Sequence, residues 1–266
     1  MSFERVVLKG WRVVFDGEKC PAGFLDKIEA ALQGDVPADW APVESSSNAS
    51  VWKIPFAGKN YVFKEYLSRG LSEALKARIK GTRAERAWAN GRMLLENGFP
   101  TPPMLLWGMK AKRNFLVTEF IPDACGLFEF LNGRMKEIRR DKRKRIIRTL
   151  ASTFGEVAGR LHSKGIIHGD LRLNNVLLTG WNAVEPIFYF IDNERNSIHK
   201  KAPLKLIKRN LVQLNMIKLD LLSRSDRLRF FRAYIRAFPA MADGKKTLAK
   251  EVCIGTEQRM KKYGGF

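Results

Sequence analysis

The sequence predicts an α+β fold in two parts, in which a small antiparallel sheet with one long helix precedes a mainly helical part. Short β-branched and aromatic runs, separated by Gly, Ser and Asn turns, fill most of about the first 120 residues. Beyond Pro122, apolar residues recur mainly at helical spacing. We therefore expect two lobes, residues 1–121 and 122–266, which together suit a chain of this length.

In the first part, strands and turns alternate around two helices. Residues 5–15 predict strand around a Gly turn, and residues 23–33 predict a short helix. The stretch 43–67 predicts strand, Ser/Asn turn, strand, Gly turn and strand. Residues 72–97 have a helical pattern that ends at NGFPTPP, where Gly and Pro stop a helix. Two further strands, in MLLWG and NFLVTEFIP, complete the predicted sheet.

In the second part, helices surround two short strand-like runs. Residues 126–138 and 141–164 have apolar residues at helical spacing. The stretch IIHGDLRLNNVLL (166–178) follows, then a short strand, PIFYFID. Further helices are expected over 203–222 and 226–238.

The chain is strongly basic, with 48 Lys and Arg against 27 Asp and Glu and a formal net charge of +21. Such an excess implies an anionic partner, namely nucleic acid, an anionic membrane surface or a phosphorylated substrate. The densest run, RMKEIRRDKRKRIIR (134–148), has nine Lys or Arg and two acidic residues. Both a binding role and a solvated helix face are open for this run.

Cysteine content and hydropathy limit the expected location. The three cysteines are far apart and have no metal-ligand spacing, so neither a disulfide framework nor a metal site of cysteines is expected. A reducing cytosol fits this usage. The N-terminal MSFERVVLKGW lacks the apolar core of a signal peptide, and no run approaches the ~20 apolar residues of a spanning helix. Any membrane contact is therefore expected to be peripheral.

Three polar residues at the edges of short apolar runs predict a site for phosphoryl transfer. Asp170 and Asn175 lie on a turn between a helix and a strand-like run, and Asp192 ends the strand IFYFID. Two such runs side by side would bring these residues together. Hard oxygen ligands of this kind suit Mg²⁺, which usually keeps waters and substrate phosphates in its shell. Phosphoryl transfer needs such a metal, an orienter for the attacking hydroxyl, and a cation on the phosphates.

A candidate cation lies upstream. Lys64, in YVFKEY, has alternating apolar neighbours and is expected to point into a cleft or into solvent. Glu85, on the helical stretch 72–97, could face that strand and hold the lysine toward phosphate oxygens. Glu73 and Glu96 share that stretch, and a solvated position is the default for each of the three.

These residues carry a resemblance to a known superfamily. Lys64, Glu85, HGDLRLNN with Asp170 and Asn175, and Asp192 resemble, in order and spacing, the catalytic set of protein-kinase-like enzymes. Within that superfamily, HGDLRLNNVLL…FIDNER and the later RNLVQLNMIKL…RLRFFRAYI are most similar to the bacterial lipopolysaccharide kinase family, which includes heptose and Kdo kinases. The likeness extends from about residue 43 to 238.

The resemblance implies a two-lobed protein-kinase-like fold and assigns a role to each residue. Asp170 would be the catalytic base or hydroxyl orienter, and Asn175 and Asp192 would bind Mg²⁺. Lys64 would bind the α- and β-phosphates of ATP, and Glu85 would position Lys64. His168 would be structural, with its imidazole bridging backbone near the metal-binding strand. The acceptor would be a hydroxyl of an inner-core lipopolysaccharide sugar, heptose or Kdo.

Two features depart from the pattern of the superfamily. The loop over the phosphates is usually rich in Gly, but here reads SSSNASVWK; Ser46, Ser47 and Asn48 would cover the phosphates, with a backbone that approaches less closely. Gly169 stands where many protein kinases have an Arg that pairs with an activation-loop phosphate. About ten residues separate Asp192 from the next helix, and no A-P-E motif follows. Regulation on that loop is therefore not expected, which leaves the acceptor side open for a bulky glycolipid.

Two other functions stay open from the sequence. A small-molecule kinase of the aminoglycoside or choline type shares the motif, although the charge of +21 disfavours cationic acceptors. A non-catalytic kinase-like module binding anionic lipid or nucleic acid would explain the charge, although no nucleic-acid motif is visible. The favoured expectation is a cytoplasmic ATP- and Mg²⁺-dependent enzyme, peripheral on the inner face of the bacterial inner membrane, with no specific nucleic-acid partner. The sugar, the hydroxyl and the oligomeric state are not specified.

Overall fold

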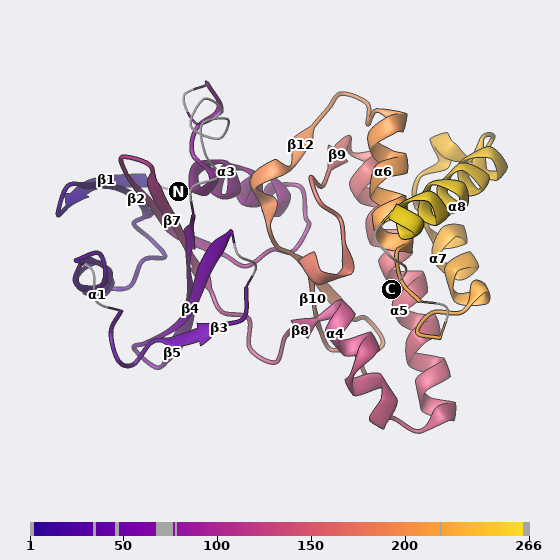
Figure 1. The fold of residues 1–266 in the computed structure, drawn as a ribbon, viewed down its shortest axis with the longest axis horizontal. Helices are drawn as coiled ribbons and strands as arrows, with labels where there is room; N and C mark the ends of the chain where they lie inside the picture. The colour runs from indigo at the N-terminus through magenta and orange to yellow at the C-terminus, as the bar shows by residue number, and fades with distance from the viewer. Residues whose placement is uncertain are drawn as a thin grey trace. The chain divides into compact units, whose positions relative to one another are not determined.

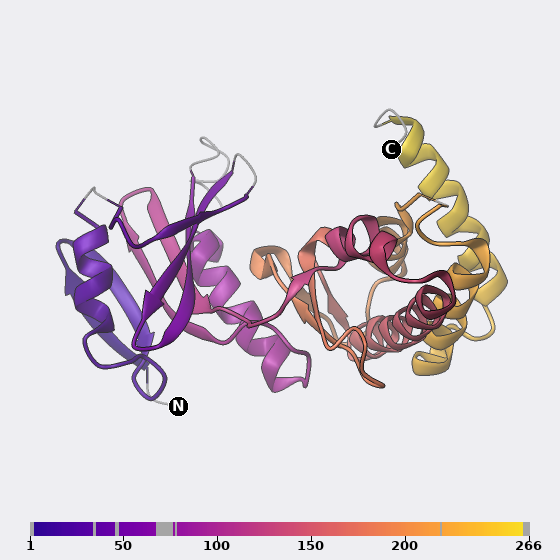
Figure 2. The same ribbon diagram turned by 90° about the horizontal axis from the view of Figure 1, so that it is seen from below.

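The computed structural model describes residues 3–33, 36–45, 48–67, 77, 79–218 and 220–262. The chain divides into two compact units, Met1–Pro122 and Asp123–Phe266. Figures 1 and 2 show the elements of each unit.

Unit 1 is built on an antiparallel sheet. Its seven described strands lie in the order β1-β2-β6-β7-β5-β4-β3, and every neighbouring pair is antiparallel. They are β1 (Phe3–Leu8), β2 (Trp11–Asp16), β3 (Ala41–Val43), β4 (Ala49–Phe56), β5 (Lys59–Tyr66), β6 (Met104–Lys110) and β7 (Arg113–Glu119). All strands predicted for this region are therefore confirmed.

Two helices of unit 1 pack on opposite faces of this sheet (Figure 2). Helix α1 (Phe24–Ala31) buries Phe24 and Ile28 in a core that includes Phe63 of β5. Helix α3 (Arg83–Glu96) packs on the other face, in a cluster that includes Tyr66 of β5. Since successive side chains in a strand alternate between faces, residue 64 belongs to the α3 face.

Helix α3 has a defined beginning and end. Thr82 caps it, because its side chain accepts from Glu85 N while the Glu85 carboxylate accepts from Thr82 N, which is a capping box. At the other end Gly98, with φ of 77°, donates to Leu95 O. A continuous helix over 72–97 is therefore wrong: Gly81 has φ of 79°, so the backbone leaves the helical region just before the cap.

Unit 2 is mainly helical. Its α-helices are α4 (Leu127–Asn132), α5 (Arg140–Ser163), α6 (Leu204–Asn215), α7 (Arg224–Ala237) and α8 (Lys245–Lys262). Short 3₁₀ turns are η1 (Arg134–Glu137), η2 (Leu173–Asn175), η3 (Asn193–Arg195) and η4 (Pro239–Met241). Strands β8 (Cys125–Gly126), β10 (Val176–Thr179) and β11 (Ile187–Phe190) form one sheet in the order β11-β10-β8, and β9 (Ile166–Ile167) pairs with β12 (Ser197–Ile198).

Helices α5 and α7 pack closely because α5 has two glycines where they meet. A Cβ on Gly155 would lie 2.3 Å from Phe230 O, and one on Gly159 would lie 2.5 Å from Tyr234 O. The backbones can therefore approach as no residue with a side chain would allow. Figure 1 shows the two helices side by side.

The helices of unit 2 differ from the predictions in three places. The helix predicted over 126–138 is divided at Gly133 into α4 and the 3₁₀ turn η1. The helix expected over 203–222 ends at Asn215. Helix α8 was not predicted from the sequence. Its buried residues are only Leu248, Val252 and Thr256, and so few buried positions give no clear helical pattern of apolar residues. Within the described part of the chain, no helix is long and apolar enough to cross a membrane.

Candidate active site

The loop after β9 approaches a neighbouring segment so closely that Gly169 has no room for a side chain. A Cβ there would lie 2.0 Å from Arg195 Cβ and 2.5 Å from Arg195 O. The Gly169 N–H donates to Asn196 Oδ1 at 3.0 Å, which fixes the loop to η3 and its flank. The glycine that replaces an arginine of many protein kinases is thus required by packing in this chain.

His168 is fully buried and bridges this loop to the end of β11. Its Nδ1 accepts from the Asp170 N–H at 3.1 Å, so its proton is on Nε2, which donates to Ile191 O at 3.1 Å. Burial lowers the pKa of His168, so the ring stays neutral. The bridge between backbone segments is the structural arrangement expected from the sequence.

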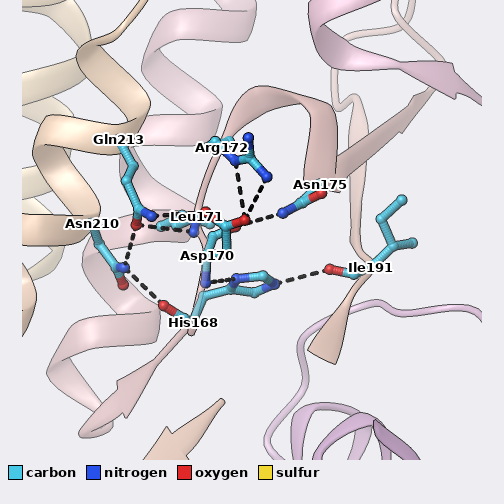
Figure 3. Close-up of polar contacts among 8 residues, drawn as sticks. All are labelled: His168, Asp170, Leu171, Arg172, Asn175, Ile191, Asn210 and Gln213. Carbon is cyan, nitrogen blue, oxygen red and sulfur yellow. Dashed lines mark hydrogen bonds and ion pairs between the residues drawn. The ribbon is translucent and has the colours of Figure 1, made fainter. Parts of the chain in front are cut away.

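The Asp170 carboxylate has a different partner on each oxygen (Figure 3). Its Oδ1 accepts from Gln213 Nε2 at 2.8 Å. Its Oδ2 accepts from Arg172, with Nε at 3.0 Å and Nη2 at 2.6 Å. The side chain is 26% exposed and Arg172 is 53% exposed, so the Oδ2 side is open to solvent. The carboxylate is therefore oriented from the interior and reachable from outside.

Asn175 and Asp192 lie at the same end of the β10–β11 hairpin. In the register of this pair Val176 faces Phe190, so Asn175 just precedes one strand while Asp192 follows the other. Ile191 N donates to Asn175 O at 3.0 Å, which closes the hairpin at this end. Asn175 Nδ2 donates to Asp170 O at 2.8 Å, so the three predicted residues share one end of the hairpin.

Asp192 has an unusual backbone conformation, with φ of 62° and ψ of 45°. Few residues other than glycine adopt this left-handed region, although Asp and Asn do so more readily than most. Strained backbones of this kind cluster at functional sites. The conformation is consistent with a defined direction for the carboxylate.

The donors at this end suit Mg²⁺. Asn175 uses its Nδ2 on Asp170 O, which leaves its Oδ1 on the other side of the amide, and Asp192 adds a carboxylate. Both are hard oxygen donors. No group of three or more His, Cys, Asp or Glu able to hold a metal occurs among the described residues. A cation here would therefore take much of its shell from water and phosphate, as Mg²⁺ commonly does.

A buried polar network lies behind the loop and was missed by sequence reasoning. Gln213 and Asn210 are buried on α6, and Asn210 Nδ2 donates to His168 O at 2.8 Å. Asn210 Oδ1 contacts His162 Nε2 at 3.1 Å, and His162 Nδ1 contacts Tyr234 Oη at 2.9 Å. The available signal was two amides at a helical spacing of three on a stripe that is otherwise apolar.

In unit 1, Lys64 is half-buried near the C-terminal end of β5. It faces Val51 on β4 and Leu116 on β7, on the side of the sheet that α3 covers. Its Nζ lies 5.2 Å from the centroid of the Tyr66 ring, and Arg83 lies over the same ring at 4.5 Å. The lysine thus extends along an aromatic surface toward the beginning of α3.

The acidic candidates on the helical stretch have local roles. Glu85 closes the α3 capping box, as described above. Glu96 forms an ion pair with Arg92 at 3.2 Å, and Glu73 lies outside the described residues. Whether Glu85 also positions Lys64 stays a prediction.

The predicted phosphate-covering loop is described only in part. Ser46 and Ser47 lie outside the described residues. The Asn48 carbonyl accepts from Leu67 N at 3.1 Å and from Arg83 Nη1 at 3.0 Å. The base of the loop is therefore tied to the end of β5 and to the beginning of α3.

A family model described as the lipopolysaccharide kinase (Kdo/WaaP) family matches residues 46–234, well over half of the chain. The chain belongs to the lipopolysaccharide kinase family. Of the functions left open by the sequence, the family match supports the lipopolysaccharide kinase. Membership makes the protein a phosphotransferase, and as a kinase it uses ATP.

A solved structure agrees with this fold. WaaP in complex with acyl carrier protein is similar to this lipopolysaccharide kinase, with a TM-score of 0.66 and 20% identity over 93% of this chain and 98% of that chain. This likeness confirms the predicted protein-kinase-like fold. An aminoglycoside-3'-phosphotransferase of type VIII has a TM-score of 0.48 and 17% identity over 86% of this chain and 98% of that chain. No curated protein sequence matches the chain.

Proposed function

We propose that this lipopolysaccharide kinase transfers the γ-phosphoryl group of ATP, with Mg²⁺, to a hydroxyl of an inner-core sugar, heptose or Kdo. The observation that supports this most directly is the Asp170 carboxylate, which is oriented from the interior and partly exposed at the end of the hairpin that carries Asn175 and Asp192. A carboxylate at this position can accept a hydroxyl proton while a metal at the hairpin end balances phosphate charge.

In this proposal Asp170 orients the sugar hydroxyl and takes up its proton. The hydroxyl oxygen forms a bond to the γ-phosphorus as the bond to the departing ADP oxygen breaks. Asn175 and Asp192 would hold the Mg²⁺, which lowers the cost of charge on the phosphates. Lys64 would bind the α- and β-phosphates, with Glu85 positioning it.

The nucleotide loop would add weaker contacts. Ser46, Ser47 and Asn48 would cover the phosphates, with hydroxyl groups as donors in place of closely approaching glycine N–H groups. The anchoring of Asn48 O by Leu67 and Arg83 supports a fixed base for such a loop.

The direct test supplies the purified protein with ATP, Mg²⁺ and an inner-core glycolipid that lacks phosphate. We expect mass spectrometry to detect one added phosphate, and fragmentation to assign it to heptose or Kdo. Lipopolysaccharide from cells without the protein should lack the same phosphate. Phosphorylation of an aminoglycoside or choline, with none of the glycolipid, would contradict the proposed acceptor.

We also propose that unit 2 docks on an anionic membrane surface through the basic run at 134–148. This run covers η1 and the first turns of α5, and most of its basic side chains are exposed. Each Lys or Arg near such a surface contributes on the order of 1 kcal/mol, screened over about 8 Å at physiological salt. Several together would support reversible binding.

Vesicle co-sedimentation tests this docking. Arg143 is left in place, because its Nη2 donates to Lys136 O at 2.8 Å and to Ile138 O at 3.0 Å and supports the local fold. The test variant replaces five exposed residues by Gln: Arg139, Arg140, Lys142, Lys144 and Arg145. We expect salt-sensitive binding to anionic vesicles by the wild type only, with ATP binding unchanged. Tight nucleic-acid binding without vesicle binding would contradict the membrane proposal.

A cavity in unit 2 suggests a second binding partner, which would insert an apolar group into it. It has a volume of about 650 Å³ and is lined mainly by apolar side chains of α4 to α8, including Leu131, Leu150, Phe154, Leu214, Phe231 and Val252. Since the similar WaaP structure contains an acyl carrier protein, we propose that an acyl group borne by such a carrier enters this cavity. Ala151→Phe, which would fill the cavity, should abolish co-purification with acylated carrier while the melting temperature is kept. Equal binding of carrier without an acyl group would contradict the proposal.

A further inference from the structure

We propose that Gln213, on α6, is a positioning residue that sets the orientation of the Asp170 carboxylate. This inference rests on the proposed role of Asp170 in catalysis. It concerns a side chain that meets neither ATP nor the acceptor in the proposed function and would act only through Asp170.

The two oxygens of Asp170 are held in different ways. Gln213, which is 5% exposed, donates to Oδ1 at 2.8 Å from the interior. Oδ2 is bound by Arg172, which is largely exposed and can exchange for a hydroxyl donor. A single buried contact thus fixes the rotation of the carboxylate and leaves Oδ2 as the oxygen that faces a substrate.

Hydrogen-bond partners determine which way the Gln213 amide points. Its Oε1 accepts from Leu171 N at 3.2 Å and from Asn210 Nδ2 at 3.1 Å. The Leu171 N–H can only donate, so the oxygen must be on that side and the NH₂ group must face Asp170. The opposite orientation would place an amide oxygen against a carboxylate oxygen.

A chain of buried donors extends from Gln213 to the far side of the helical core. Asn210 donates through Nδ2, so its Oδ1 accepts from His162 Nε2. His162 Nδ1 then lacks a proton and accepts from the Tyr234 hydroxyl. Every donor in the chain points toward Asp170, and hydrogen bonds aligned in this way strengthen one another.

Burial preserves the direction of this chain. It lowers the pKa of His162 to about 4, so the ring remains neutral with one donor and one acceptor. It also raises the pKa of Tyr234, so the hydroxyl keeps its proton. Because these groups stay neutral, each hydrogen bond in the chain keeps its donor and its acceptor. The chain therefore holds the Asp170 carboxylate in one orientation without placing a second charge beside it.

The contact with Asp170 exceeds what holding the loop requires. Asn210 already binds His168 O, and Gln213 Oε1 already binds Leu171 N. If Gln213 only held the loop, its Oε1 acceptor would be enough, and its Nε2 donor would not be needed. The two roles therefore separate in Gln213→Glu, which keeps an acceptor for Leu171 but presents a second carboxylate to Asp170.

The experiment measures kcat, both KM values and the melting temperature for Gln213→Met and Gln213→Glu in the full chain. Both substitutions should lower kcat about 10- to 100-fold, on the order expected for a misplaced catalytic group. KM for ATP and for glycolipid should change less than about twofold, since neither is contacted. Ser223→Ala is the control, because it removes the α7 cap at a distance and should lower the melting temperature with kcat unchanged.

A double-mutant cycle adds a result that a structural role alone would not produce. In the Asp170→Asn background, Gln213→Met should not change the residual kcat further, because the carboxylate it positions is gone. Normal kcat in Gln213→Glu, or equal losses in both backgrounds, would overturn the inference while leaving the proposed function intact. Full turnover in Asp170→Asn, or no transfer to glycolipid by the wild type, would overturn the proposed function and the inference together.

Discussion

The two units hold the residues of the proposed site in different ways. In unit 2, His168, Asp170 and Asn175 are tied to one another and to α6 through hydrogen bonds of about 3 Å. In unit 1, Lys64 extends along Tyr66, and Glu85 serves the cap of its own helix. The proposed catalytic carboxylate thus depends on a long-range network of hydrogen bonds. The proposed nucleotide-binding residues depend instead on the sheet and on the first turn of α3. Substitutions in the two units should therefore fail in different ways.

The largest effect is expected at the centre of the unit 2 network. Asp170→Asn keeps the size of the side chain but removes the proton acceptor, and should lower kcat about 10²- to 10⁴-fold. ATP binding should persist, because the proposed metal ligands remain. Steady-state kinetics measure the loss of kcat, and nucleotide titration measures ATP binding. Asp192→Asn is the comparison variant, and it should weaken Mg·ATP binding itself. Near-normal turnover in Asp170→Asn would show that Asp170 is not the base.

Lys64→Met should come next, with a loss of roughly 10²- to 10³-fold, comparable to removal of one strong electrostatic contact in a transition state. The methylene groups of the new Met side chain can still lie on the Tyr66 ring, so the free energy of unfolding should change little. Paired measurements of turnover and urea unfolding test this. Loss of folding with loss of activity would mean that the lysine serves the sheet rather than the phosphates.

The stability of the two units should depend differently on pH, because all three histidines of the chain lie in unit 2. Burial lowers the pKa of His162 from 6.5 to about 4, so the unfolded state takes up a proton between these values that the folded state does not. The free energy of unfolding of unit 2 should therefore fall as pH decreases from about 6.5 to about 4, by about 3 kcal/mol from this group. His168, whose pKa burial also lowers, acts in the same direction.

Hydrogen exchange at amides of α5 and α7, compared with β4 and β5, measures this dependence in each unit. His162→Gln should reduce the fall, because it removes the buried group that takes up a proton on unfolding. An unchanged pH dependence in His162→Gln would show that other groups cause it.

Glu85→Gln should have the smallest effect. Gln also completes a capping box, so the beginning of α3 should be preserved and only the charge is lost. If Glu85 positions Lys64, kcat should fall a few-fold, on the order of 1 kcal/mol for a partly exposed pair. Thr82→Ala is the matched control, since it removes the cap and keeps the charge. Wild-type activity in Glu85→Gln would limit Glu85 to capping.

Local patterns predicted much of the fold. The strands of unit 1 and the helix stop after Glu96 were visible because each depends on neighbours in sequence. The roles of Lys64, Asp170, Asn175 and Asp192 came instead from the resemblance to a known family, and they stay predictions. The roles of Gln213 and His162 were not visible in the sequence, because they arise only when α5, α6 and α7 meet. Helix α8 was missed because it buries few residues, and the break at Gly81 because one positive φ interrupts an otherwise helical pattern.

The two glycines of α5 have a genetic consequence. A methyl group at Gly159 would meet the backbone of Tyr234, whose hydroxyl begins the donor chain toward Asp170. Gly159→Ala would therefore push α7 outward and disturb the proposed catalytic carboxylate from a helix that never touches it. Alleles that fail only at raised temperature should accordingly be found at Gly155 and Gly159, and a screen for conditional loss of the kinase would recover them among substitutions remote from its site.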